Sequence, residues 1–86
     1  MAVLIVRGPI RDRAGGRGEH ALAGDSVLEL LRSLEREYPA LSGWVLDERG
    51  AIRRHINIYV NGERGDATTA LQVRDRVDVV PAITGG

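Results

Sequence analysis

The pattern of hydrophobic and polar residues near the start of the chain indicates an N-terminal hairpin. Residues 2–7 form a short run rich in Val and Ile that ends at Gly8 and Pro9, which is typical of a buried strand. Residues 11–18 are polar and contain glycine, so we expect a turn there. Residues 19–22 can then pair back against the first strand.

Apolar residues at helical spacing predict a helix that begins after Ser26. Ser26 and Glu29 form an S-x-x-E capping box, in which each side chain can accept a hydrogen bond from a free amide at the helix start. Pro39 ends the helix because it disfavours helical geometry at the residue before it. The apolar residues between them lie on one stripe and are Val27, Leu30, Leu31, Leu34 and Tyr38. A helix with one apolar face needs a sheet against which that face can pack.

Beyond this helix the spacing becomes irregular and then changes to the period of a strand. Residues 40–53 are expected to form an irregular connection with a short helical turn and to place Trp44 in the core. From Arg54 onward alternate residues point to opposite faces, and Asn61-Gly62 is typical of a type I′ hairpin turn. One face carries Ile56, Ile58 and Val60, and the other carries His55, Asn57 and Tyr59.

The last segments complete an α+β order. Residues 67–71 suggest a turn of helix, and residues 77–80 suggest a last strand. Pro81 cannot donate to the sheet, so the chain should leave it there. The first and last strands then become parallel neighbours in a mixed sheet with one main helix on one face, which is the β-grasp, or ubiquitin-like, fold. We expect one domain, residues 1–86, in which residues 82–86 are an exposed tail.

Length and charge narrow the classes of function. The chain has 86 residues, which suits one small domain. Its formal net charge is zero, so no long-range field favours nucleic acid or an anionic membrane. Its apolar runs are too short to span a membrane, and its first residues lack the pattern of a signal peptide. We therefore expect a soluble, cytoplasmic protein with neither a nucleic-acid nor a membrane partner.

The side chains do not predict a stand-alone enzyme. Cysteine is absent, and the only histidines, His20 and His55, have no metal-ligand spacing, so no metal site is expected. None of the serines, Ser26, Ser33 and Ser42, lies in a G-x-S-x-G sequence.

The C-terminal residues 82–86, with the sequence AITGG, remain as the candidate reactive group. One interpretation is structural, because chain ends fray and tolerate glycine. The other is chemical, because a Gly-Gly end can thread a narrow channel and its backbone can approach an active site closely. The position of this end directly after a strand that stops at Pro81 favours the chemical interpretation.

Two stretches of the sequence resemble the bacterial ubiquitin-like sulfur carriers. The first is HINIYVNG at residues 55–62, and the second is VDVVPAITGG at residues 77–86. The sequence EYPAL at residues 37–41 and the loop after it resemble the molybdopterin and cysteine carriers, and the long connection from the helix to the next strand looks closest to the carrier that serves a cysteine synthase. The family often has an Asp-Gly-Asp-like turn before its last strand, whereas this chain has VRD at residues 73–75. Arg74 is therefore strained if that turn needs a positive φ.

The resemblance implies that an E1-like adenylating enzyme activates the Gly86 carboxylate with ATP. A sulfur donor would then displace AMP and leave a C-terminal thiocarboxylate that supplies sulfur for the biosynthesis of cysteine or a related metabolite. Gly86 would carry the sulfur, Gly85 would allow passage into the active site, and no cofactor would bind to the chain itself. The residues expected to bind partners are Ala82, Ile83 and Thr84 in the tail, and Tyr59 and Val80 on the sheet face opposite the helix.

The acceptor enzyme stays open among three. It could be a cysteine synthase, the large subunit of molybdopterin synthase, for which this chain would be the small subunit, or a thiazole synthase, for which it would be the thiamine sulfur carrier. Two hypotheses belong to other classes. The chain could be a non-catalytic ubiquitin-like interaction module, or a protein modifier whose Gly86 becomes amide-linked to a target lysine.

Overall fold

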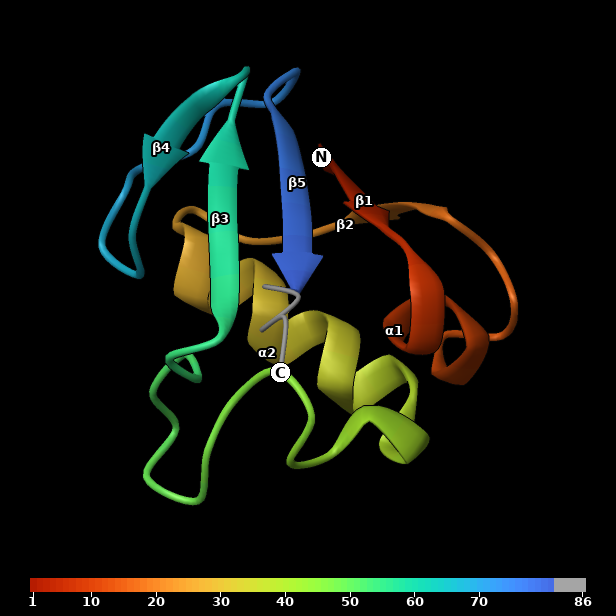
Figure 1. The fold of residues 1–86 in the computed structure, drawn as a ribbon. Coiled ribbons are helices and arrows are strands. Elements are labelled where there is room, and N and C mark those ends of the chain that lie inside the picture. Colours follow the sequence, from red (N-terminus) through yellow and green to blue (C-terminus); the bar gives the residue numbers. More distant parts are fainter. Residues whose placement is uncertain (82–86) are drawn as a thin grey trace.

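The structure is a computed structural model that describes residues 1–81. In chain order its elements are β1 (Ala2–Val6), α1 (Gly8–Arg13), β2 (Glu19–Leu22), α2 (Val27–Glu37), the 3-10 helix η1 (Pro39–Leu41), β3 (Ile56–Val60), β4 (Glu63–Gly65) and β5 (Arg76–Pro81). The strands form one sheet in the order β2-β1-β5-β3-β4. β1 and β5 are parallel neighbours, the other pairs are antiparallel, and α2 lies across one face (Figure 1). The expected β-grasp fold is confirmed.

The core lies between the sheet and α2. Residues along β1, β3 and β5 alternate between buried and half-buried, because successive side chains point to opposite faces of a strand. Ser26 caps α2 as predicted, and its Oγ accepts a hydrogen bond from the backbone N–H of Glu29 at 3.3 Å. The largest fully buried side chains are Leu4, Leu30, Leu31, Leu34 and Leu41, with Val6, Val27, Val45, Val77 and Val79. Within residues 1–81, no helix is both long and apolar enough to cross a membrane.

The segment after β1 contains a helix that the spacing did not predict. α1 starts at Gly8 and has Pro9 in its first turn, where the missing N–H of proline costs no helical hydrogen bond. Ile10 is buried and attaches α1 to the core. The expectation of a turn over residues 11–18 is therefore wrong for residues 11–13, which belong to α1.

Trp44 lies at the surface, and the expectation that it belongs to the core is wrong. Its side chain is 40% exposed, whereas its neighbours Leu41, Val45 and Leu46 are buried. These smaller side chains already fill the core beneath this loop. The guanidinium carbon of Arg13 lies 3.9 Å from the centre of the Trp44 ring, in a cation–π contact that holds the indole against α1.

Two turns at one end of the sheet show how the last strands are connected. Asn61 and Gly62 both have positive φ, 52° and 85°, which the predicted type I′ turn requires. This turn leads into β4, a short strand that the spacing did not predict. Among residues 1–81 Asn61 is the one non-glycine residue with positive φ, so Arg74 is not strained. The turn before β5 is closed instead by the N–H of Asp75, which donates to the carbonyl of Gln72 at 3.1 Å.

Residues 67–71 form a side-chain-stabilised turn and an isolated bridge, not the expected turn of helix. Asp66 Oδ1 accepts hydrogen bonds from the backbone N–H and the hydroxyl of Thr68, at 2.9 and 2.7 Å. Such local bonds compete with the helical pattern. Ala70 then pairs with Ser26, just before α2.

Candidate functional site at the end of β5

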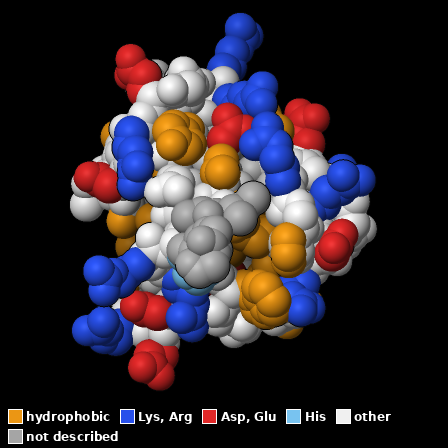
Figure 2. Space-filling view, viewed as in Figure 1, with side chains coloured by type: hydrophobic (Ala, Val, Ile, Leu, Met, Phe, Trp, Pro, Cys, Tyr) orange, Lys and Arg blue, Asp and Glu red, His pale blue; other side chains and the backbone are white. Residues whose placement is uncertain are grey.

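Tyr59 and Val80, the predicted docking residues that the structure describes, lie on the sheet face opposite α2, here called the open face. Each alternates along its strand with buried residues that point toward α2. Tyr59 is opposite Asp78 in the sheet register, and Asn57 is opposite Val80. Tyr59 and Val80 are therefore diagonal neighbours on adjacent strands, within reach of a large side chain. Figure 2 views the open face and shows hydrophobic side chains near its middle.

The open face also carries a carboxylate that two arginines neutralise. Arg76 Nη2 donates to Asp78 Oδ1 at 3.3 Å, and Arg7 Nη2 lies 3.7 Å from the same oxygen. Val3 and Ile5 lie half-buried beside this cluster on β1. The open face is therefore a mixed surface on which apolar side chains surround one paired carboxylate.

The predicted reactive tail follows the last residue of β5. Five predicted site residues lie outside the part of the chain that the structure describes, namely Ala82, Ile83, Thr84, Gly85 and Gly86. Pro81 is the last described residue and lies opposite Ile56 in the sheet register. Five extended residues span at most about 17 Å, so chain length alone keeps Gly86 within that distance of Pro81.

Two adjoining apolar hollows border Pro81. The first has a volume of about 250 Å³ and is lined by Arg7, Gly8, Pro9, Val80 and Pro81. The second has a volume of about 170 Å³ and is lined by Pro9, Ile10, Trp44, His55, Ile56 and Pro81. Pro9 and Pro81 belong to both linings, so α1, the loop before β3 and the end of β5 meet at this point.

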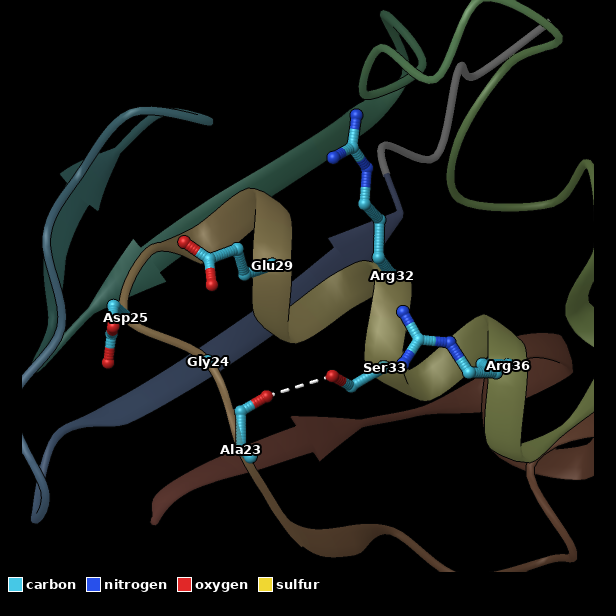
Figure 3. Close-up of a pocket in the computed structure, with 7 residues that line it drawn as sticks. All are labelled: Ala23, Gly24, Asp25, Glu29, Arg32, Ser33 and Arg36. Carbon is cyan, nitrogen blue, oxygen red and sulfur yellow. Dashed lines mark hydrogen bonds between the residues drawn. The ribbon is translucent and has the colours of Figure 1, made fainter.

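A larger hollow beside α2, with a volume of about 390 Å³, shares no residue with the hollows at Pro81 (Figure 3). Its lining consists of Ala23, Gly24, Asp25, Glu29, Arg32, Ser33 and Arg36. The charges of the two carboxylates and the two guanidinium groups balance, and the hydroxyl of Ser33 already donates to the carbonyl of Ala23 at 2.8 Å. This lining contains neither histidine nor cysteine, so it offers no nucleophile with an adjacent base.

The two histidines have separate environments. His20 is buried, with its Nε2 at 2.8 Å from the carbonyl oxygen of Arg17 and its ring edge-on to Tyr38. His55 lies in the lining of the smaller hollow at Pro81. Among residues 1–81 no three His, Cys, Asp or Glu side chains come together in a way that could hold a metal ion.

Three loop carboxylates have a pKa below the usual range, because hydrogen-bond donors face each of them. A lowered pKa keeps a carboxylate ionised at neutral pH, which makes it a weak general base. The leading causes are the backbone amide of Ala51 for Asp47, the hydroxyl of Thr68 for Asp66 and the side-chain amide of Asn61 for Asp75. The hydrogen bonds that cause these shifts stabilise turns, and the shifts do not identify a catalytic group.

Sequence reasoning missed the contribution of α1 and Trp44 to the surface around Pro81. The Gly8-Pro9 pair was a usable signal, because proline is favoured in the first turn of a helix. For Trp44 the sequence offered no comparable signal, since its partner Arg13 is distant along the chain and comes close only in the fold.

Four similarities to known proteins extend over most of the chain. The model of the ThiS family matches residues 4–86. The sulfur carrier protein CysO of Mycobacterium tuberculosis is 32% identical over 83 residues, which cover 90% of this chain and 89% of that protein. Small archaeal modifier protein 3 of Haloferax volcanii is 37% identical over 65 residues, which cover 71% of this chain and 70% of that protein. The crystal structure of Mycobacterium tuberculosis CysO matches with a TM-score of 0.85 and 28% identity, over 96% of this chain and 100% of that chain.

Proposed function

The chain belongs to the ThiS family, and we propose that it is a sulfur carrier whose C-terminal Gly86 is converted to a thiocarboxylate. The observation that carries this proposal is the position of the Gly-Gly end. It follows the last strand of a β-grasp sheet with only three residues between Pro81 and Gly85. In this proposal a short segment tethers the carboxylate of Gly86 to the domain.

The proposed chemistry takes place at that carboxylate and needs a partner enzyme. A carboxylate is a poor electrophile, so one of its oxygens first attacks the α-phosphorus of ATP and pyrophosphate leaves. A sulfide-level donor then attacks the carbonyl carbon of the acyl-adenylate, and the carbon–oxygen bond to AMP breaks. The product carries sulfur at Gly86 as a nucleophile. The chain acts as a carrier and co-substrate, and the adenylating enzyme supplies the catalytic groups and binds ATP.

We propose the biosynthesis of cysteine or a related metabolite as the destination of the sulfur. The similarity to the sulfur carrier protein CysO over 90% of the chain supports this destination. The acceptor would then be an enzyme of the cysteine-synthase type. The roles of molybdopterin synthase small subunit and of thiamine sulfur carrier would use the same thiocarboxylate with a different acceptor.

Protein modification is a second candidate function, and one similarity favours it. The chain is 37% identical to small archaeal modifier protein 3 over 71% of its length. In that function a lysine amine of a target protein would attack the activated Gly86, AMP would leave and an amide bond would form. The same adenylate serves both functions, so they differ only in the nucleophile that attacks it.

The open face is proposed to dock the partner enzymes. Tyr59 and Val80 are diagonal neighbours there, and both are half-buried without facing the core. An apolar surface beside the start of the tail would let an enzyme hold the domain while the terminus enters its active site.

Intact mass spectrometry tests the proposed function. The chain, with its own C-terminus and no tag there, is incubated with ATP, a sulfide donor and the adenylating enzyme from the same organism. We expect a mass gain equal to the replacement of one oxygen by sulfur, located at Gly86 by fragmentation. An unmodified terminus, with an enzyme that thiolates another carrier under the same conditions, would contradict the carrier function. An amide-linked target in place of sulfur would support the modifier function.

A further inference from the structure

The surface around Pro81 combines apolar residues from three separate segments. We call this surface the collar and define it as Pro9 of α1, Trp44 and His55 of the long loop, and Val80 and Pro81 of β5. These residues line the two adjoining hollows at the end of β5. Pro9, Trp44 and His55 are exposed, and Val80 and Pro81 are half-buried. The collar therefore surrounds the residue from which the tail departs.

Arginines border the collar. The guanidinium group of Arg13 stacks on Trp44 at 3.9 Å, and Arg7 lines the larger hollow. Within residues 1–81 no carboxylate lies within ion-pair distance of Arg13, whereas Arg7 shares Asp78 with Arg76. The border of the collar therefore carries positive charge that the described part of the chain does not neutralise.

Trp44 is not one of the side chains that fill the core. The core beneath its loop is already filled by Leu41, Val45 and Leu46. The stacked guanidinium holds the indole ring in one orientation, and such preorganisation lowers the entropy that a binding partner must overcome. Tryptophan and arginine are also the residues most enriched among those that dominate binding energy.

We infer that the collar is a docking surface for the adenylating enzyme, and that the enzyme meets it with an apolar channel mouth bordered by carboxylates. This inference rests on the proposed function. Gly86 lies no more than about 17 Å of chain from Pro81. An enzyme that draws the Gly86 carboxylate into an active site must bring the rim of its channel against the residues that surround Pro81. The unneutralised arginines assign a negative charge to that rim.

Steady-state adenylation, followed by pyrophosphate release, tests the collar through the KM for the carrier. Trp44→Ala should raise this KM by about 10- to 100-fold and leave kcat nearly unchanged, because it removes binding without touching the reacting atoms. The matched control is Val73→Ala, which truncates a side chain that is 71% exposed in the turn before β5. This control should keep the KM of the unmodified chain.

A charge reversal tests the assigned polarity of the rim. Arg13→Glu should raise the KM by about tenfold at low salt and by less at high salt. Arg74→Glu changes the net charge equally at the opposite end of β5 and should have little effect. Arg13 is exposed, so this variant remains informative if Trp44→Ala lowers the melting temperature.

The possible outcomes distinguish a failure of the collar inference from a failure of the proposed function. If the unmodified chain is thiolated and both collar variants keep its KM, the collar inference is overturned and the carrier function stands. If Arg13→Glu and Arg74→Glu raise the KM equally, the rim is not specifically acidic and the assigned polarity is wrong. If the unmodified chain is never adenylated, the proposed function fails and the collar inference fails with it.

Discussion

β5 begins in a turn whose polar groups bond to one another, and it ends between apolar hollows that the fold leaves open. At its start Asn61 donates from Nδ2 to the carboxylate of Asp75 at 3.0 Å and accepts at Oδ1 from the N–H of Arg76 at 3.0 Å. The other carboxylate oxygen of Asp75 accepts from the N–H of Gln72 at 2.8 Å. The bonds of Asn61 connect the turn before β4 to the turn before β5.

The other end of β5 has no equivalent network among residues 1–81. Pro81 cannot donate a backbone hydrogen bond, and the collar around it consists of apolar side chains and His55 and is bordered by arginines. Under the collar inference, this strand has a structural end and a binding end. Where polar groups satisfy one another, a substitution should affect stability, and where apolar groups and charges stay open, it should affect partners.

Changing the length of the tail should produce the largest contrast between the two ends. Deleting Gly86, or adding one residue after it, should abolish thiolation, because the carboxylate no longer reaches the site of adenylation in the same position. The melting temperature should not change, since residues 82–86 follow the last strand of the sheet. The matched control adds one residue before Met1, which is 68% exposed at the opposite end of the sheet. Full thiolation of either tail variant would contradict the proposed function.

Widening the tail next to the reactive residue should have the second largest effect. Gly85→Leu should lower the rate of thiolation by about 100-fold, because a small displacement of a reacting group has effects of this size. Gly85→Ala should give an intermediate rate, since it adds only a methyl group. Circular dichroism and thermal melting provide the check on folding. A loss of folding in Gly85→Leu would indicate a terminus that packs against the domain.

At the start of β5 a substitution should reverse the pattern and affect stability alone. Asn61→Ala removes two side-chain hydrogen bonds and places alanine at φ 52°, so it should lower the free energy of unfolding by about 1–2 kcal/mol. Asn61→Gly removes the same bonds but tolerates the positive φ, and its loss should be smaller. Urea denaturation measures both, and the KM for the adenylating enzyme should stay unchanged. A raised KM in the glycine variant would mean that partners also use this end.

The same contrast explains which features the sequence could predict. α2 followed from signals within a few residues of one another, namely the capping serine, the apolar stripe and Pro39. β3 followed from a period of two and from the Asn61-Gly62 turn, which needs only local φ values. The parallel pair of β1 and β5 belonged to the β-grasp arrangement expected from the order of the elements, in which one amphipathic helix packs on a sheet.

The collar could not be predicted in this way. Its members come from α1, from the long loop and from the end of β5, and their proximity depends on the finished sheet. α1 is a short helix whose one buried anchor, Ile10, has no helical stripe around it. Trp44 was expected in the core because it is large and apolar. Its exposure arises because the neighbouring side chains of Leu41, Val45 and Leu46 occupy the core instead, and only the fold shows this. The Gly-Gly tail was the opposite case, since its interpretation came entirely from its sequence and from its place after the last strand.

The smallest expected effect is a pH dependence that belongs to the start of β5. Hydrogen bonds from Asn61 and from the N–H of Gln72 lower the pKa of Asp75. A carboxylate with a lower pKa in the folded state than in the unfolded state stabilises the fold above its unfolded pKa, and this contribution is lost as the pH falls through the folded pKa.

Asp75→Asn should therefore lower the melting temperature most above pH 5, and the difference from the unmodified chain should shrink below about pH 4. Asp12→Asn is the control at the collar end, because no donor within residues 1–81 hydrogen-bonds to Asp12, and this variant should change the melting temperature little. Calorimetric melting of the three proteins between pH 2.5 and pH 7 measures both differences. A difference for Asp75→Asn that stays constant between pH 2.5 and pH 7 would show that ionisation of Asp75 contributes nothing to stability, and that hydrogen bonds close this end of β5 without any contribution from charge.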